Sequence, residues 1–207
     1  MAYFVGWSLF LIFFKIYLSF KVVGRENVPK EGAFIFVSNH SSYFDPILLG
    51  TSIHRSLYYM ARENLFWKPF FAWIMRQVHA FPVKRDSGDL GALKQAIAIL
   101  KDGKPLVMFP EGTRSKDKRL RGAKPGVGFI AAKAGVPIVP AYIDGSLGAL
   151  PGSLNTLKRH PVNVYIGEPI IFDLDHGRNS KEVYQKISDE IMARITALRD
   201  KHVGKAG

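Results

Sequence analysis

The sequence predicts one α/β domain with a mostly parallel central sheet flanked by helices, preceded by an N-terminal hydrophobic helix. The first observation behind this fold class is a chain of 207 residues without an internal repeat or an interdomain linker. The second is that short apolar runs rich in strand formers alternate with stretches of helical periodicity, as is typical of parallel sheets. The third is the apolar composition of the first 20 residues.

Six apolar runs are expected to form strands, and five other segments are expected to form helices. The strands are residues 33–38, 56–60, 80–83, 105–109, 136–142 and 162–166. The helices are residues 46–52, 65–78, 90–100, 126–134 and 180–202. In the last helix, apolar residues recur every three or four positions after Ser180, the expected N-cap. This helix is predicted to lay its apolar face on the core.

Residues 1–20 are predicted to form a membrane-anchoring helix, and residues 21–207 to form the α/β domain. The N-terminal segment contains eight aromatic residues and a single charged side chain, Lys15. A helix from Tyr3 to Phe20 would extend about 27 Å, close to the roughly 30 Å of a hydrocarbon core, so it either spans the bilayer or lies in its surface. Basic residues such as Lys21 and Arg25 follow it, which places the domain at the cytoplasmic face of the cell membrane. The alternative is an ordinary buried core helix.

The charge balance indicates an anionic partner. Lys and Arg total 29 and Asp and Glu total 17, giving a formal net charge of +12. Nucleic acid, anionic lipid headgroups and phosphorylated substrates would all be attracted to such a surface. The absence of cysteine excludes disulfides, thiolate metal sites and a cysteine nucleophile. The six histidines show no metal-ligand spacing, so no metal is expected.

The first candidate for chemistry is the segment Asn-His-Ser-Ser-Tyr-Phe-Asp-Pro at residues 39–46, which directly follows an expected strand. α/β folds place their sites at such strand ends. Pro46 is a favoured first helical residue, so His40 and Asp45 flank a turn. The turn can bring the carboxylate to one imidazole nitrogen and leave the other nitrogen as a base. The alternative is that Asp45 only caps the next helix and His40 is an ordinary turn residue.

The second candidate is the segment Phe-Pro-Glu-Gly-Thr-Arg-Ser at residues 109–115, which also follows an expected strand. Gly112 allows the backbone to approach a ligand closely. Thr113 offers a hydroxyl group, and Arg114 offers a planar fork that suits phosphate. The alternative is a polar surface turn followed by a solvated basic loop.

Together these segments resemble signature blocks of the glycerolipid acyltransferases, particularly the 1-acyl-sn-glycerol-3-phosphate acyltransferases. An H-x4-D motif at His40 and Asp45 stands some seventy residues before FPEGTRS, as in that family. Weaker blocks occur in the family's order at residues 81–85 and 136–140, and the similarity extends over roughly half of the chain. The sequence departs from the family at His79, where a glycine usually opens the middle block.

The resemblance implies a glycerol-3-phosphate acyltransferase-like fold and a role for each matching residue. His40 is implied to deprotonate the acceptor hydroxyl, with Asp45 fixing its tautomer and orientation. The implied donor is acyl-CoA or acyl-carrier protein as co-substrate, without a further cofactor, and the implied acceptor is 1-acyl-sn-glycerol 3-phosphate, giving phosphatidic acid. The residues expected to bind substrate are Arg85, Glu111, Gly112, Thr113 and Arg114.

Three alternatives to this reading remain at the level of sequence. The acceptor can be glycerol 3-phosphate, lyso-ornithine lipid or another lysolipid, since each would need similar residues. Ser41 or Ser42 can act as a nucleophile in a covalent route, but neither is surrounded by a G-x-S-x-G motif. From a different class, the net charge and the basic run at residues 114–124 would suit a nucleic-acid-binding protein. We expect membrane lipids and a lysophospholipid as partners, and no nucleic acid.

Overall fold

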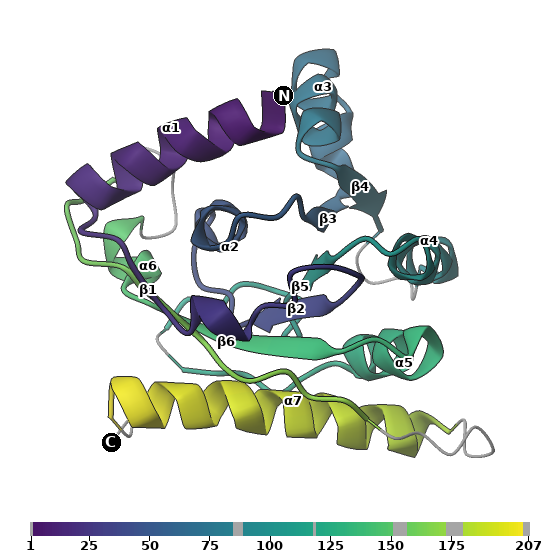
Figure 1. Ribbon diagram of the computed structural model, residues 1–207. Coiled ribbons are helices and arrows are strands. Elements are labelled where there is room, and N and C mark those ends of the chain that lie inside the picture. The colour runs from purple at the N-terminus through teal and green to yellow at the C-terminus, as the bar shows by residue number, and fades with distance from the viewer. Residues whose placement is uncertain (1, 85–88, 118, 151–156, 173–179, 205–207) are drawn as a thin grey trace.

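The computed structural model describes residues 2–84, 89–117, 119–150, 157–172 and 180–204, with residues 2–5 described by their backbone alone. A seven-stranded sheet in the order β1-β7-β6-β2-β5-β3-β4 forms the centre of this part of the chain (Figure 1). All neighbouring strands are parallel except β6 and β7, which are antiparallel. The strands are β1 (Lys21–Val23), β2 (Ile35–Ser38), β3 (Tyr58–Arg62), β4 (Ala80–Val83), β5 (Leu106–Met108), β6 (Ile138–Asp144) and β7 (Asn163–Ile166).

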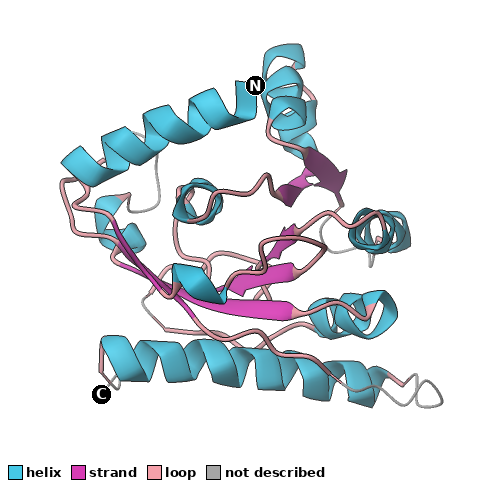
Figure 2. Cartoon of the chain, viewed as in Figure 1, coloured by secondary structure: helices cyan, strands magenta, loops and turns pink. Residues whose placement is uncertain are grey.

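Helices cover both faces of the sheet (Figure 2). α1, α2 and α6 lie on one face, and α4, α5 and α7 lie on the other (Figure 1). The α-helices are α1 (Ala2–Tyr17), α2 (Asp45–Ser52), α3 (Pro69–Gln77), α4 (Leu90–Lys101), α5 (Pro125–Ala134), α6 (Ser146–Ala149) and α7 (Lys181–His202). Two 3-10 helices, η1 (Arg25–Asn27) and η2 (Glu63–Phe66), complete the described elements. The predicted α/β class with a mostly parallel sheet is therefore confirmed.

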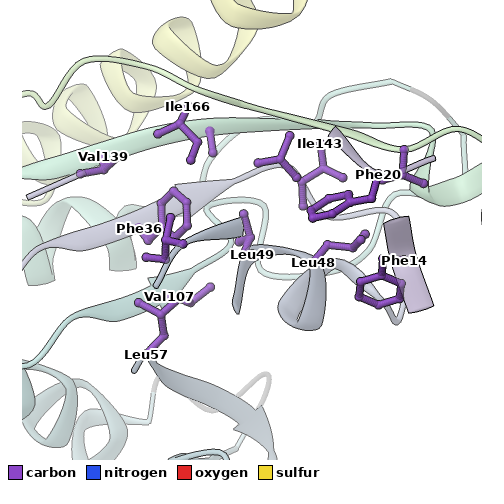
Figure 3. Packing of buried hydrophobic residues seen from close by; sticks show 14 of the residues in the cluster. Phe14, Phe20, Phe36, Leu48, Leu49, Leu57, Val107, Val139, Ile143 and Ile166 are labelled. Carbon is purple, nitrogen blue, oxygen red and sulfur yellow. The ribbon is translucent and has the colours of Figure 1, made fainter. Parts of the chain in front are cut away.

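The core consists of two apolar clusters, one on each face of the sheet. Side chains alternate across a strand, so Phe36 of β2 enters the cluster beneath α1 and α2, whereas Ile35 and Val37 enter the cluster beneath α4, α5 and α7. Figure 3 shows Phe36 among residues of the first cluster, with Leu48 and Leu49 of α2 beside it. All four residues of β2 are completely buried. A central parallel strand covered on both faces is expected to be apolar throughout, as β2 nearly is.

The expected elements differ from the observed ones at three places. The helix expected at residues 65–78 is divided, because Lys68 is extended before Pro69 and the α-helix begins anew at that proline. β1, a strand of three residues, was not expected. The short helix α6 was also not expected. Each of the six expected strands overlaps an observed strand.

The N-terminal helix has one face on the domain and one face in solvent. Phe14 and Leu18 are fully buried in the first cluster, where Figure 3 shows Phe14 close to Leu48 of α2. The indole Nε1 of Trp7 also donates a hydrogen bond of 2.8 Å to the carbonyl oxygen of Ile53. The segment predicted as an anchor therefore also contributes to the core. Among the described residues, no helix combines the length and apolar character needed to cross a bilayer.

His79, at the position where the resembled family usually has a glycine, has a left-handed backbone. Its φ is 56°, in a region that residues other than glycine rarely occupy. The ring stacks on Tyr58 with 4.8 Å between centroids, and Nδ1 lies 2.9 Å from the hydroxyl of Ser56. These contacts hold the histidine in place at the turn into β4.

Candidate active site

The candidate site lies where the carboxyl ends of three neighbouring strands meet. β2 lies between β5 and β6, and the three strands are parallel. The loop after β2 carries His40, the loop after β5 carries Glu111, and β6 ends at Asp144. Because parallel strands end at the same edge, residues separated by about seventy positions or more in the sequence become neighbours.

The carboxylate of Asp45 holds the first loop together. Its Oδ2 accepts hydrogen bonds from the backbone N–H groups of Ser41 at 2.6 Å and Ser42 at 2.7 Å, and lies 2.8 Å from Nδ1 of His40. Asp45 is completely buried at the N-terminus of α2, where the partial positive charge of the helix stabilises an anion. Phe44 is the N-cap residue, and no side chain caps this helix. The alternative reading of Asp45 as an N-cap is therefore wrong.

This hydrogen bond sets the protonation pattern of the neutral imidazole. A carboxylate only accepts hydrogen bonds, so Nδ1 of His40 carries the proton and Nε2 keeps its lone pair. The ring of His40 stacks on that of Phe109, with 4.0 Å between centroids and 16° between the planes. Nε2 has no hydrogen-bond partner in the part of the chain that the structure describes. The geometry presents a general base with a fixed orientation.

Glu111 connects the loop after β5 to the loop after β2. Its Oε1 accepts a hydrogen bond of 3.1 Å from the backbone N–H of His40, and its Oε2 accepts one of 3.3 Å from that of Arg121. The backbone N–H of Ser115 donates in turn to the carbonyl oxygen of His40 at 2.7 Å. Burial raises the pKa of the Glu111 carboxyl, and the two N–H donors act in the opposite direction. Both carboxylate oxygens therefore engage the main chain of the site.

Asn39 fixes the other side of the first loop. Its Nδ2 donates to the carbonyl oxygen of Ile143 at 2.9 Å, and its Oδ1 accepts from the N–H of Ile143 at 2.7 Å. The side chain thus extends the pairing of β2 with β6 by one more residue. The main chain at His40 is thus held from two sides. Asn39 connects it to β6, and Glu111 connects it to the loop after β5.

The expected phosphate-binding residues lie on the loop that Glu111 begins. Gly112 has a φ of 68°, in the left-handed region that favours glycine, and a Cβ built there would lie 2.8 Å from Cδ of Lys124. Thr113 is exposed. Arg114 places its guanidinium Cζ 3.5 Å from the ring centroid of Tyr43. Arg85 lies outside the described residues.

A pocket of about 260 Å³ opens beside His40. Asn39, His40, Ser41 and Glu111 line it on one side, and residues from the end of β6, together with His160, line it on the other. Gly112, Thr113 and Arg114 do not line this pocket, although they belong to the adjoining loop. Among the described residues, no group of three or more histidine, aspartate or glutamate side chains could hold a metal ion.

Sequence reasoning found the imidazole and both carboxylates but missed the residues that position them. Asn39 and Phe109 are the first residues of the two recognised segments, but neither was assigned a role, and their contacts to Ile143 and His40 cross 104 and 69 positions of sequence. The signal available was their position where two expected strands end. Tyr43, inside the H-x4-D spacing, was likewise not assigned a role.

The fold and this site define a class: α/β enzymes with a carboxylate-oriented histidine at the carboxyl edge of a parallel sheet. The chain belongs to the acyltransferase family, whose family model matches residues 19–144. The resemblance stated from the sequence is therefore confirmed.

Two relatives and one solved structure are similar to the chain. A 1-acyl-sn-glycerol-3-phosphate acyltransferase of Bacillus subtilis is 34% identical over 185 residues, which cover 87% of this chain and 88% of the relative. A chloroplastic 1-acyl-sn-glycerol-3-phosphate acyltransferase of Brassica napus is 37% identical over 153 residues, which cover 72% of this chain and only 44% of the relative. The crystal structure of the 1-acyl-sn-glycerophosphate acyltransferase PlsC of Thermotoga maritima superposes with a TM-score of 0.73 at 29% identity, covering 95% and 81% of the two chains.

Substituting Glu111 distinguishes a positioning role from a substrate-binding role. In Glu111→Gln only one oxygen remains as an acceptor, so either the N–H of His40 or that of Arg121 faces an amide NH₂ group. We expect the rate constant kcat for acyl transfer to fall about tenfold, since a misplaced base costs transition-state stabilisation. The acceptor KM should change little. A large rise in KM at unchanged kcat would instead assign Glu111 to substrate binding.

The pH dependence of stability gives an independent measurement on the same variant. Because the folded-state pKa of Glu111 is raised, its stabilising contribution is complete below the ordinary glutamate pKa of about 4.3 and is lost as the pH rises through the raised value. The free energy of unfolding of the wild type should therefore decrease relative to that of Glu111→Gln as the pH rises above about 4.3. Urea unfolding at a series of pH values measures this trend, and a constant difference would contradict it.

Proposed function

We propose that the protein transfers a fatty acyl group from acyl-CoA or acyl-carrier protein to the free hydroxyl of 1-acyl-sn-glycerol 3-phosphate, giving phosphatidic acid for phospholipid synthesis. The observation that carries this proposal is the His40–Asp45 pair, whose Nε2 is available at a pocket. The names of the Bacillus and Brassica relatives support the choice of acceptor. The loop of Arg114, anchored to His40 through Ser115, supports a phosphorylated acceptor.

In the proposed reaction, Nε2 of His40 takes the proton of the acceptor hydroxyl as its oxygen attacks the thioester carbonyl. An alcohol has a pKa far above 7, so removing its proton during attack contributes about 10²–10⁴-fold to the rate. The carboxylate of Asp45 stabilises the imidazolium that forms. The tetrahedral intermediate then expels the thiolate as the C–S bond breaks, and the proton passes from Nε2 to the leaving sulfur. The base is thereby regenerated.

The contacts of the neighbouring serines favour this direct attack over a covalent acyl-enzyme. The hydroxyl of Ser41 lies 3.0 Å from the hydroxyl of Ser146. The hydroxyl of Ser42 donates to the carbonyl oxygen of Leu150 and accepts from the N–H of Phe44. Neither hydroxyl is hydrogen-bonded to His40, as a serine nucleophile activated by that histidine would be.

The acceptor phosphate is assigned in this proposal to Arg114, with Gly112 and Thr113 beside it and Arg85 as a further cation. Arg114 makes no hydrogen bond or ion pair within the described ranges, so its N–H donors are available to a ligand. Glycerol 3-phosphate would use the same phosphate contacts, and lyso-ornithine lipid would not. Identifying the products formed with each of these acceptors therefore identifies the acceptor that the protein uses.

We further propose that the protein works at the cytoplasmic face of the cell membrane, held there by two apolar surfaces. On α1, the side chains of Leu9, Ile12 and Ile16 are more than half exposed. On the segment from η2 to α3, the exposed side chains are Trp67 (75%), Phe70 (67%) and Trp73 (59%). Tryptophan is favoured at membrane–water interfaces, and the exposed Lys68 and Arg76 of this segment suit anionic headgroups. The positive net charge then serves lipid rather than nucleic acid.

The proposed mechanism predicts different kinetics for two substitutions in the catalytic pair. His40→Ala should lower kcat by about 10²-fold or more with little change in acceptor binding, because the base acts only as the hydroxyl attacks. Asp45→Asn should be milder, since three donors converge on Oδ2 and favour an amide oxygen at that place, which keeps the tautomer but loses the charge. The measurement is steady-state kinetics with mass spectrometry of the products from acyl-CoA and a panel of acceptors.

His54→Ala is the matched control, because the ring of His54 contacts Trp7 of α1 and His54 does not line the pocket. It should retain near-normal turnover. Thermal melts of all variants separate lost chemistry from lost folding. Near-normal turnover by a folded His40→Ala protein would rule out the proposed mechanism.

The proposed membrane surface predicts weaker lipid binding when its exposed aromatics are removed. The triple variant Trp67→Ser, Phe70→Ser, Trp73→Ser should bind anionic vesicles at least tenfold more weakly, because aromatic side chains contribute most of the apolar area that reaches the lipid. Its circular dichroism should match that of the wild type. Vesicle flotation is the measurement, and Leu90→Ser with Ile171→Ser, equally exposed positions outside the two surfaces, is the control. Unchanged flotation of the triple variant would leave α1 and the basic surface as the attachment.

A further inference from the structure

Tyr43 of the first loop contacts Arg114 of the second. The guanidinium Cζ of Arg114 lies 3.5 Å from the centre of the Tyr43 ring, which is van der Waals contact. Tyr43 is 47% exposed, so the pair lies at the surface of the site and not in the core. The contact is the one interaction of Arg114 that the described part of the chain provides.

The short separation defines how the guanidinium lies on the ring. An N–H group pointing into the ring would hold Cζ farther away, because the nitrogen and its hydrogen would lie between them. With Cζ itself in contact, the guanidinium covers the face of the ring and its N–H groups are directed away from it around the edge. Stacking on an aromatic face is a characteristic use of arginine, and it leaves the bidentate donors for an anion.

We propose that Tyr43 is a positioning residue that holds Arg114 ready for the phosphate of the acceptor. This inference rests on the proposed function, and it adds a residue that selects phosphorylated over uncharged acceptors. A free arginine side chain loses rotamer entropy when a ligand fixes it. The stacked side chain has already lost part of that freedom, so the phosphate binds more tightly.

The position of Tyr43 also couples phosphate binding to the catalytic base. Tyr43 stands between His40 and Asp45, within the turn that Asp45 closes. Arg114 is next to Ser115, whose N–H donates to the carbonyl oxygen of His40. The ring and the backbone hydrogen bond thus hold Arg114 at a fixed place relative to His40. An acceptor bound through its phosphate would present its hydroxyl at a defined distance from Nε2.

The test compares Tyr43→Leu with Tyr43→Phe in the full-length protein. Removing the aromatic face should raise the KM for 1-acyl-sn-glycerol 3-phosphate about three- to thirtyfold, as expected for a lost cation–π contact, with kcat within about threefold of wild type. Tyr43→Phe keeps the face and should restore the wild-type KM. For 1-acylglycerol, which has no phosphate, Tyr43→Leu should leave the KM unchanged. In an Arg114→Ala background, Tyr43→Leu should add no further effect.

Three outcomes would overturn the inference: equal increases in KM for the charged and uncharged acceptors, additive effects with Arg114→Ala, or the same defect in Tyr43→Phe. Stabilisation by inorganic phosphate, measured by thermal shift, tests the pair without turnover. It should be weaker in Tyr43→Leu than in wild type, and equal stabilisation would overturn the inference. If wild-type protein transfers no acyl group to the lysophospholipid, the proposed function fails, and the phosphate titration still decides the role of Tyr43.

Discussion

The geometry of the site depends on one buried carboxylate oxygen. Oδ2 of Asp45 collects the imidazole Nδ1 of His40 and the backbone N–H groups of Ser41 and Ser42. A carboxylate without exposure to solvent is costly unless donors and positive charge surround it. The imidazole and the loop before α2 supply the donors, and the N-terminus of α2 supplies the partial positive charge. The same contact closes the turn and selects the tautomer of a histidine that lines the pocket.

Sheet topology supplies the rest of the constraint. Because β2 lies between β5 and β6, the loop after β2 can be fixed from both sides. On the β5 side Glu111 accepts a hydrogen bond from the N–H of His40, and on the other side Asn39 is hydrogen-bonded to Ile143 of β6. The family resemblance implied that Glu111 contacts substrate. Its occupied oxygens favour a role in holding the base, which leaves Arg114, a half-buried cation of the same loop, as the residue proposed to bind phosphate. A phosphate site and a base then stand on two loops joined by backbone hydrogen bonds and by the Tyr43–Arg114 contact.

The sequence was sufficient for what depends on local pattern and insufficient for what depends on distant contacts. Periodicity identified six of the seven strands, and motif spacing identified His40, Asp45 and the loop of Glu111. The stacking of Phe109 on His40 could not be predicted from the sequence, since no local pattern indicates which residues of neighbouring strand ends contact each other. Whether α1 is buried could not be decided for a similar reason: an apolar helix has the same sequence pattern whether its partner is lipid or, as for Phe14, the domain core. Burial in the core was therefore only the alternative to a membrane anchor. The break before Pro69 could have been predicted from the sequence, because a proline disfavours the helical conformation of the residue that precedes it.

The proposed mechanism depends most directly on the protonation state of the His40 imidazole. Nitrogen NMR of ¹⁵N-histidine-labelled protein measures that state. The His40 signals are assigned by their loss in His40→Ala. At a pH where the imidazole is neutral, the proposed mechanism predicts that Nδ1 carries the proton and donates it in a hydrogen bond to Asp45, and that Nε2 is unprotonated. Asp45→Ala should abolish this preference. A neutral His40 with its proton on Nε2 would contradict the general-base mechanism, because that nitrogen could not then accept the proton of an attacking hydroxyl.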